Sequence, residues 1–191
     1  MDQVTGLQRC IRGRGTPACP KWLALGFAMI LRLSAFAMDG PLEYQVKAAF
    51  LLNFTKFVQW PATAFAAADS PIAICVWGND PFGKVLDQIV AEEVVDGRRV
   101  VVRRIKGTPA PHACQALFVN GTEKEALGSL SGLGPGVLTI GEGEGFVHRG
   151  GMIAFVVENR HVRFGINESA AAAAGLKLSS KLLSVARSVE K

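Results

Sequence analysis

The chain has 191 residues, of which 49% are hydrophobic and 19% are charged, and its formal net charge is +5. This length suits one globular domain or two small ones, and the apolar fraction excludes a chain that is mainly disordered. Four cysteines are too few for a small disulfide-rich scaffold. The positive charge indicates a nucleic-acid-binding protein only if the basic residues lie in the folded part of the chain.

Residues 1–37 have the pattern of a secretory signal peptide. Basic residues precede an apolar run at 22–31, and a small-x-small site follows at 35–37. We therefore expect an exported protein that is cleaved after Ala37. An uncleaved anchor is the alternative, although the apolar segment contains Arg32 and is shorter than the roughly 20 residues that span a bilayer.

Most of the net charge lies in this predicted leader. It contains five of the 21 basic residues and one of the 16 acidic residues, which leaves residues 38–191 with a net charge of +1. A nearly neutral exported domain has no electrostatic reason to bind nucleic acid. We therefore expect no nucleic-acid partner.

Two cysteines, Cys75 and Cys114, remain after removal of the leader. An even pair in an exported chain is a candidate for a disulfide bond, and each cysteine lies in a predicted core strand. Two buried thiols that never meet are the alternative. The bond would close a loop of 39 positions and would remove roughly 4 kcal/mol of chain entropy from the unfolded state.

The remaining chain begins with a predicted helix over residues 43–58. Apolar residues recur there at spacings of three and four, which is typical of one buried helical face. The helix ends before Pro61, because the residue that precedes a proline is displaced from helical backbone angles. The predicted face consists of Val46, Ala49, Phe50, Asn53, Phe54 and Phe57.

Strands and helices then alternate. Residues 71–77 are almost all apolar, which predicts a strand buried on both faces of a sheet. Asp80 is the predicted cap of a helix that begins at Pro81 and runs to about residue 91. Next come predicted strands at 98–105 and 113–120 and a helix that begins at Thr122.

The C-terminal part contains a glycine-rich loop and a hairpin. Its predicted elements are a strand at 137–140, the loop 141–150, a hairpin of strands 151–157 and 161–167, a helix at 168–174, and a segment at 176–189 whose second half is helical through Leu182, Leu183 and Ala186. This alternation predicts a single α/β domain of three layers, with a mixed, mostly parallel sheet flanked by helices and a C-terminal hairpin plus helix.

No catalytic motif is visible in the sequence. The three histidines lack metal-ligand spacing, and no nucleophile–base pair can be identified. We therefore expect no enzymatic activity, no metal and no cofactor. The loop 141–145 follows a strand as a phosphate-binding loop does, but Glu142 and Glu144 would repel a phosphate. This loop fits a tight turn better and is only a weak candidate for a ligand site.

Basic residues cluster on and beside the predicted strand at 98–105. In an exported protein they fit an edge strand that charge keeps soluble. A docking face for an acidic partner is the alternative. The cluster consists of Arg98, Arg99, Arg103, Arg104 and Lys106.

Several short motifs follow one another in an order that is shared with a known family. They are VKAAFLLNFTKFVQWP at 46–61, ICVWG at 74–78, DPFG at 80–83, CQALF at 114–118, LTI at 138–140, EGF at 144–146, GGM at 150–152, VRFGIN at 162–167 and AGLKLSSKLL at 174–183. Over essentially all of residues 38–191, the chain resembles the YfiR-like periplasmic proteins.

The resemblance implies a regulatory protein. YfiR-like proteins resemble a soluble repressor that binds the periplasmic part of an inner-membrane diguanylate cyclase and keeps cyclic-di-GMP synthesis off. An outer-membrane peptidoglycan-binding lipoprotein can sequester that repressor. The resemblance also implies a homodimer and a disulfide between Cys75 and Cys114. The founding repressor has a second, labile cysteine pair near 141–152, where this chain has no cysteine, so redox sensing by that pair is not expected.

We therefore expect a non-enzymatic periplasmic repressor that acts through protein–protein contacts. Such contacts need an exposed apolar surface, for which the candidate residues are Phe146, Leu176, Leu178 and Leu182. The alternative is a periplasmic module that binds a small molecule, because glycine-rich strand ends of α/β sheets are common ligand sites.

Overall fold

The computed structural model describes residues 40–107, 110, 112–120 and 132–191. The predicted leader and the helix predicted to begin at Thr122 lie outside these residues. Within the described segments, no helix is both long and apolar enough to cross a membrane.

Helix α2 (Gly40–Phe57) confirms the helix predicted at 43–58. Its buried side, however, is not the predicted one. The side chains that face the core are Ala48, Leu51, Leu52 and Phe54. Of the six residues predicted to be buried, Val46, Asn53 and Phe57 are exposed, Ala49 and Phe50 are half-buried, and only Phe54 is buried. The prediction was wrong because α2 is apolar on two sides, and spacing alone does not decide which side meets the sheet.

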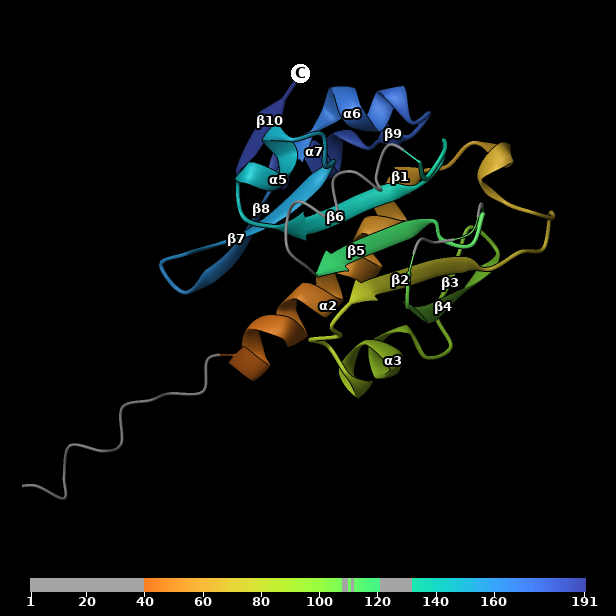
Figure 1. The fold of residues 1–191 in the computed structure, drawn as a ribbon, viewed down its shortest axis with the longest axis horizontal. Coiled ribbons are helices and arrows are strands. Elements are labelled where there is room, and N and C mark those ends of the chain that lie inside the picture. Colours follow the sequence, from red (N-terminus) through yellow and green to blue (C-terminus); the bar gives the residue numbers. More distant parts are fainter. Residues whose placement is uncertain (1–39, 108–109, 111, 121–131) are drawn as a thin grey trace, which may run out of the picture. The chain divides into compact units, whose positions relative to one another are not determined.

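The main sheet has eight strands within the described residues, in the order β10-β8-β7-β6-β5-β2-β4-β3 (Figure 1). The strands are β2 (Ile72–Gly78), β3 (Val94–Val95), β4 (Arg98–Ile105), β5 (Ala116–Asn120), β6 (Leu138–Glu142), β7 (Ile153–Glu158), β8 (His161–Asn167) and β10 (Ser188–Glu190). Neighbouring strands run parallel except in the pairs β7–β8 and β3–β4. This mixed, mostly parallel sheet confirms the predicted α/β fold class.

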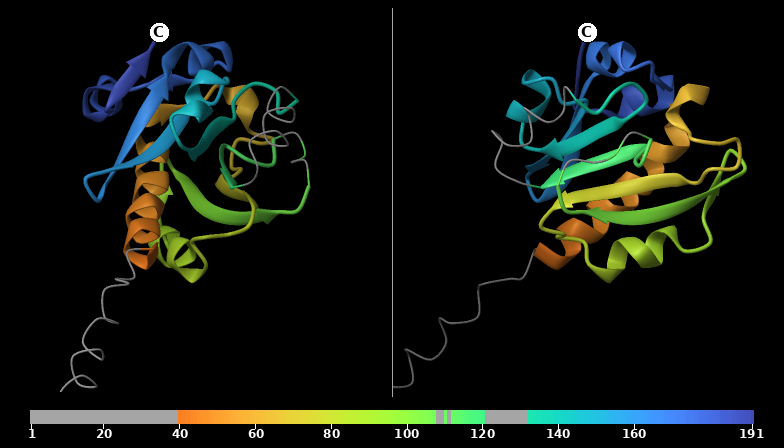
Figure 2. Two further views of the ribbon diagram at one scale, coloured as in Figure 1. Left: turned by 60° about the vertical axis from the view of Figure 1, so that its left-hand side comes forward. Right: turned by 45° about the vertical axis from the view of Figure 1, so that its right-hand side comes forward.

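The longer described helices pack on one face of this sheet, and the one-turn helix α5 (Gly145–His148) lies on the other (Figure 2). Helix α2 runs across one face, and α3 (Lys84–Val90) packs against it. The same core receives side chains from α6 (Glu168–Ala173) and α7 (Ser180–Val185), whereas α5 contributes to a separate apolar cluster. The remaining elements are the short helix η2 (Ala62–Ala64) and a small antiparallel sheet of β1 (Val58–Gln59) and β9 (Lys177–Leu178).

Alternate residues of the central strand β2 belong to the two clusters. Ile72 and Ile74 contribute to the cluster that contains α2, and Ala73 and Cys75 contribute to the cluster that contains α5. Each of these four residues is at most 1% exposed. The prediction of a strand buried on both faces is therefore confirmed.

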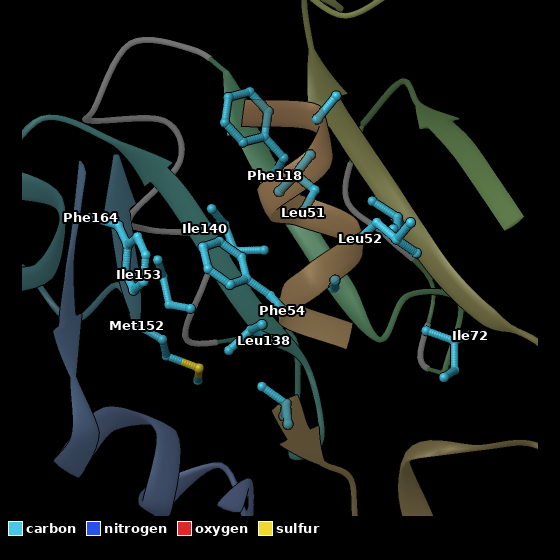
Figure 3. Close-up of a cluster of buried hydrophobic side chains, with 14 of the residues drawn as sticks. Leu51, Leu52, Phe54, Ile72, Phe118, Leu138, Ile140, Met152, Ile153 and Phe164 are labelled. Atoms are coloured by element: carbon cyan, nitrogen blue, oxygen red, sulfur yellow. The ribbon is translucent and has the colours of Figure 1, made fainter. Parts of the chain in front are cut away.

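Aromatic side chains join α2 to the sheet (Figure 3). The ring of Phe54 stacks on Phe155 with a centroid distance of 5.7 Å and meets Phe164 edge-on at 5.1 Å. Phe118 packs edge-on against Phe82, which precedes α3, at 4.8 Å. Offset and edge-on pairs of this kind add roughly 0.5–1.5 kcal/mol each to the burial of their surface. Helix α2 therefore depends on strands that lie about 100 residues later in the chain.

Helix α3 begins at Lys84 and not at Pro81. Asp80 Oδ1 accepts hydrogen bonds from the backbone N–H groups of Phe82 and Gly83 at 2.8 and 3.1 Å. These bonds form a turn ahead of the helix, so Asp80 stabilises the approach to α3 and does not cap its first turn.

The C-terminal part contains the predicted hairpin but differs beyond it. Strands β7 and β8 are joined by Asn159 and Arg160, whose φ angles of 49° and 65° are those of a type I′ turn. The second half of the segment 176–189 was predicted to be helical, but helix α7 ends at Val185, and Ser188–Glu190 form β10, which pairs parallel with β8. A strand of three residues has no detectable periodicity, so the sequence pattern did not reveal it.

Candidate functional site

The four predicted partner-binding residues do not form an exposed apolar surface. Phe146, Leu176 and Leu182 are only 6%, 3% and 3% exposed, and Leu178 is half-buried in β9. That part of the prediction was wrong because Leu176 and Leu182 pack into the core around α2. Whether Leu178 contacts a partner stays a prediction.

Phe146 is buried between two glycines, Gly141 in β6 and Gly151 just before β7. A Cβ atom at Gly151 would lie 2.2 Å from the Phe146 ring, and one at Gly141 would lie 2.5 Å from it. Only glycine allows the backbone to approach the ring so closely at these two positions. The close packing of Phe146 therefore explains why these two positions are glycines, and no bound ligand is needed to account for them.

The predicted disulfide between Cys75 and Cys114 is present, with a Cα–Cα distance of 5.7 Å. Both cysteines are buried. The adjacent Gln115 is also buried, and its side chain accepts a hydrogen bond from Ala73 N–H at 2.9 Å and donates one to the Ala64 carbonyl oxygen at 2.7 Å. The disulfide and Gln115 together hold β2, β5 and the segment before β2 in one arrangement.

Helix α2 presents an apolar face to solvent. This face, which we call the α2 stripe, consists of the exposed residues Leu42, Val46 and Phe57, the half-buried residues Ala49 and Phe50, and the polar residue Asn53. Leu42, Val46 and Phe57 are 64%, 38% and 37% exposed. Exposed apolar side chains that lie together mark a contact surface more often than scattered ones do. The sequence pattern contained all of these residues except Leu42 but assigned them to the core.

A depression lies beside this helix at the carboxyl ends of β6 and β7. It has a volume of about 380 Å³ and is widely open to solvent. Its lining consists of Glu43, Lys47, Glu142, Gly143, Glu144, Phe155, Val156, Val157 and Glu158. Ligands of α/β sheets bind at such strand ends, so the loop proposed from the sequence as a weak ligand site does contribute to a concave surface.

Lys47 is the central charge of this strand-end depression. Its side chain is only 3% exposed and forms ion pairs with Glu43 and with Glu142, the second at an Nζ–Oε1 distance of 2.6 Å. The ammonium group also lies 4.5 Å from the centre of the Tyr44 ring, within the range of a cation–π interaction. Helix α2 supplies three of these residues, and the end of β6 supplies Glu142.

The surroundings of Lys47 keep it charged. Burial alone would lower the pKa of this ammonium group, but hydrogen bonds to Glu142 and Glu43 outweigh burial and raise the pKa above its usual value. Burial and the negative charge of Glu142 likewise raise the pKa of Tyr44. Lys47 is therefore a fixed cation between two carboxylates at neutral pH and does not act as a base.

A second charged group lies at the rim of the depression. Arg187, which precedes β10, forms ion pairs with Glu144 and with Glu158, the second at an Nε–Oε1 distance of 2.6 Å. Glu144 begins the α5 region and Glu158 ends β7, so this arginine connects three segments. His148 of α5 lies 2.9 Å from Glu190 of β10.

The basic cluster on β4 is partly structural. Arg98 donates a hydrogen bond to the Ser70 carbonyl oxygen at 2.6 Å, and Arg104 forms ion pairs with Asp80 and Asp87. The prediction made β4 the edge strand of the sheet. In the structure β3 lies outside it and pairs with Arg98 and Arg99. The rest of β4 extends past this two-residue partner, so charge protects most of its outer side as expected.

The described histidines form no metal site. Among the residues that the structure describes, no group of three or more His, Cys, Asp or Glu side chains has the arrangement needed to hold a metal ion.

The sequence interpretation did not single out Lys47 and Glu142 as a pair. The available signal was a lysine inside an otherwise apolar stretch of α2, next to buried Ala48 and Leu51. A charged residue that lies at the boundary of a core requires a partner of opposite charge. The position of that partner, 95 residues later, follows from the fold alone.

Comparison with known protein families identifies the family of this chain. Residues 44–187 match the YfiR/HmsC-like family, so the match covers most of the chain and nearly all of the described residues. The protein therefore belongs to the YfiR/HmsC-like family, whose members are known for periplasmic regulation of diguanylate cyclases. A comparison with curated proteins gives no match.

Proposed function

We propose that this protein is a periplasmic regulator that binds the periplasmic part of an inner-membrane diguanylate cyclase and represses its output of cyclic-di-GMP. The family match over residues 44–187 carries this proposal. An outer-membrane lipoprotein of the peptidoglycan-binding kind is the proposed antagonist, which would sequester the regulator and release the cyclase. The protein acts by contact and not by catalysis, in keeping with the regulatory role of the family.

The export step has its own test. The leader pattern at 1–37 supports cleavage after Ala37. N-terminal sequencing of the protein recovered from the periplasm of expressing cells should give Met38 as the first residue. A protein that stays with the membrane fraction and retains residues 1–37 would support the uncleaved anchor instead.

Exposed apolar side chains support a contact function. Val157, at the end of β7, is 51% exposed and lines the strand-end depression. The depression is rimmed by charged residues, as protein–protein contact surfaces commonly are. We propose the hairpin β7–β8 and this depression as the surface that meets the cyclase.

Repression is tested by expressing the protein together with a membrane cyclase from its own genome and measuring cyclic-di-GMP. Repression predicts a fall to near the level of a strain without the cyclase. The variant Val157→Asp should relieve repression, whereas Val185→Asp, at a 63% exposed valine of α7, should not. No affinity of the purified protein for any periplasmic cyclase domain of that genome would overturn the proposal.

A small-molecule-binding module is the second candidate, because the strand-end depression is concave and charged. A ligand that binds only the folded state raises Tm according to its concentration. A thermal-shift screen should then find a compound whose effect is lost in Glu142→Gln, with Glu142 and Phe146 protected from hydrogen exchange upon binding. If the screen finds no such compound, the small-molecule hypothesis is contradicted and the depression is proposed only as a protein contact surface.

A further inference from the structure

Strand β4 leaves most of its outer side unpaired. It lies second from one end of the main sheet, and the hairpin β7–β8 lies toward the other end (Figure 1). The outer neighbour β3 pairs only with Arg98 and Arg99, and one further hydrogen bond joins Val100 N–H to the Glu93 carbonyl oxygen at 2.9 Å. No other described segment pairs with this side of β4. Residues 101–105 therefore form an open strand edge, which we call the β4 edge.

The backbone of the β4 edge points outward at two residues. Successive residues of a strand direct their N–H and C=O groups to opposite sides. Because the Val100 N–H bonds outward to Glu93, the peptide groups of Val102 and Arg104 point outward as well, away from β2. Each of these two residues thus offers one backbone donor and one backbone acceptor. An extended polypeptide can pair with such groups as an added strand.

Cationic side chains border the β4 edge. Arg99 and Arg103 share a face of the sheet with Val101, which packs in the apolar cluster around the disulfide, and Lys106 follows the strand. All three cations are exposed. Arg103 donates a hydrogen bond to the Ala113 carbonyl oxygen at 2.8 Å, but in the described part of the chain no carboxylate forms an ion pair with any of the three. Their charge is therefore available to a partner.

The opposite face of β4 has a charge that is already compensated. There Arg104 forms ion pairs with Asp80 and Asp87, each at 2.7 Å. The two aspartates would repel further carboxylates on this face, whereas Arg99 and Arg103 would attract them on the other. An added strand alternates its side chains between the two faces. The β4 edge therefore suits a strand whose acidic residues all lie on one face.

We propose that the β4 edge binds an extended acidic segment of another protein by strand addition. The outward peptide groups pair with its backbone, and Arg99, Arg103 and Lys106 meet its carboxylates. Charge decides the occupant, because a basic edge repels the same edge of a second copy and attracts an acidic chain. The charge that protects this edge from self-pairing thus also selects its partner. The β4 edge is separate from the proposed cyclase contact, so both surfaces can be occupied at once.

Fluorescence anisotropy of a short labelled peptide of alternating valine and glutamate, titrated with the full chain at low salt, tests the binding. We expect saturable binding that weakens as salt is added. Hydrogen exchange should show protection of the Val102 and Arg104 amides in the complex. Absence of binding at low salt would overturn the proposal.

The backbone contribution is tested with the same peptide methylated at all of its central backbone nitrogens. This probe keeps the charge of the first peptide but cannot pair as a strand through either of its edges. Its dissociation constant should be about tenfold higher or more. Equal binding of the two peptides would show that charge alone holds the acidic chain and would overturn strand addition.

The cations are tested with the double variant Arg99→Gln/Lys106→Gln, which changes only exposed side chains and should raise the dissociation constant about tenfold. Lys177→Gln/Lys181→Gln is the matched control, because it removes the same charge from exposed lysines of β9 and α7. It should change the constant less than twofold, and an equal effect of the two double variants would overturn the proposal.

Vesicles of phosphatidylglycerol separate a protein partner from an anionic lipid surface. If the chain sediments with these vesicles through Arg99 and Lys106 but does not bind the peptide, the β4 edge is a membrane contact and the proposal is wrong. Repression of the cyclase, measured with Val157→Asp, uses different residues. The two proposals can therefore fail or succeed independently.

Discussion

At the scale of single residues, Lys47 is the buried charged side chain of the described part of the chain, and carboxylates balance its charge. Lys47 lies between Glu43 and Glu142, and its long side chain would otherwise bury an unpaired cation. Gln115 is buried in the same way, with its amide oxygen and nitrogen both bonded to backbone groups. These residues hold segments together that are far apart in the sequence.

Replacing Lys47 with methionine should destabilise the fold by about 3 kcal/mol, near the lower end of the cost of breaking a buried ion pair. The lower end applies because Glu43 and Glu142, which would face each other, are 29% and 35% exposed. Urea denaturation measures the loss. The double variant Lys47→Met/Glu142→Gln should recover part of it, and a single-variant loss below roughly 1 kcal/mol would contradict the paired role.

Replacing Gln115 with leucine should cost about 2–4 kcal/mol, because the Ala73 N–H and the Ala64 carbonyl oxygen would each remain buried without a partner. Gln115→Glu is the comparison, because the ionised side chain keeps the acceptor for Ala73 but places a buried carboxylate oxygen beside the Ala64 carbonyl oxygen, whereas the protonated side chain can donate to it. Relative to the wild type, the Tm loss of Gln115→Glu should therefore shrink as the pH falls, whereas the loss of Gln115→Leu should not. Equal Tm values for the wild type and Gln115→Leu would argue against the bridging role.

Arg104 makes the stability depend on pH. Its hydrogen bond holds the pKa of Asp87 below the ordinary value of 3.8. A carboxyl with a lowered pKa stabilises the fold above its ordinary pKa, and this contribution disappears as the pH falls through the lower native value. Arg104→Gln should therefore reduce stability more at pH 7 than at pH 2.

The expected loss for Arg104→Gln at pH 7 is below about 1 kcal/mol, because Asp87 is 47% exposed. Urea midpoints at the two pH values measure it, and NMR titration should show the pKa of Asp87 rising toward its ordinary value. The same loss at pH 2 and pH 7 would indicate a contribution that does not depend on the charge of Asp87.

At the scale of elements, the loop after β6 shows how a glycine-rich sequence can serve packing. Gly151→Ala should cost roughly 1–3 kcal/mol, the usual range for overpacking, because the added Cβ would overlap the Phe146 ring at 2.2 Å. A double-mutant cycle with Phe146→Leu tests this, since a smaller and more flexible side chain should make the two losses less than additive. Additive losses in urea denaturation would contradict it.

Helix α2 shows which structural information the sequence contained. The spacing of its apolar residues predicted the helix and its approximate ends, since periodicity is a local property. The same spacing fits either side of the helix. The side that faces the sheet is the one from which Leu51 and Phe54 pack with Phe118 and Phe155, and this packing depends on the folded sheet. The periodicity of the sequence therefore could not predict that the α2 stripe is exposed and is a candidate contact surface.

At the scale of the whole molecule, alternating strands and helices were sufficient to predict the fold class. The two cysteines of residues 38–191 favoured a disulfide over two separate thiols, and the structure contains that bond. The depression was not predictable in the same way. Its lining comes from α2, β6 and β7, whose meeting depends on the strand order. The expected exposure of Leu176 and Leu182 was wrong on the same ground, because these residues are apolar but face inward.

Removal of the disulfide by Cys75→Ala/Cys114→Ala should lower the free energy of unfolding by roughly 4 kcal/mol, from the lost restriction of the unfolded chain. The closed loop has a sequence separation of 39 residues. Urea midpoints with and without reductant provide the control, because the variant should no longer respond to reductant. A wild type whose midpoint is the same in both conditions would contradict the stabilising role.

The contact between Phe54 and Phe155 also affects the biosynthesis of this protein. A chain grows from its N-terminus at about 5–20 residues per second, and Phe155 follows Phe54 by about 100 residues. For roughly 5–20 s the ribosome thus presents a helix with two apolar sides and no sheet to receive either. A nascent chain in this state is a substrate for holding chaperones, and α2 is the segment that we expect them to bind.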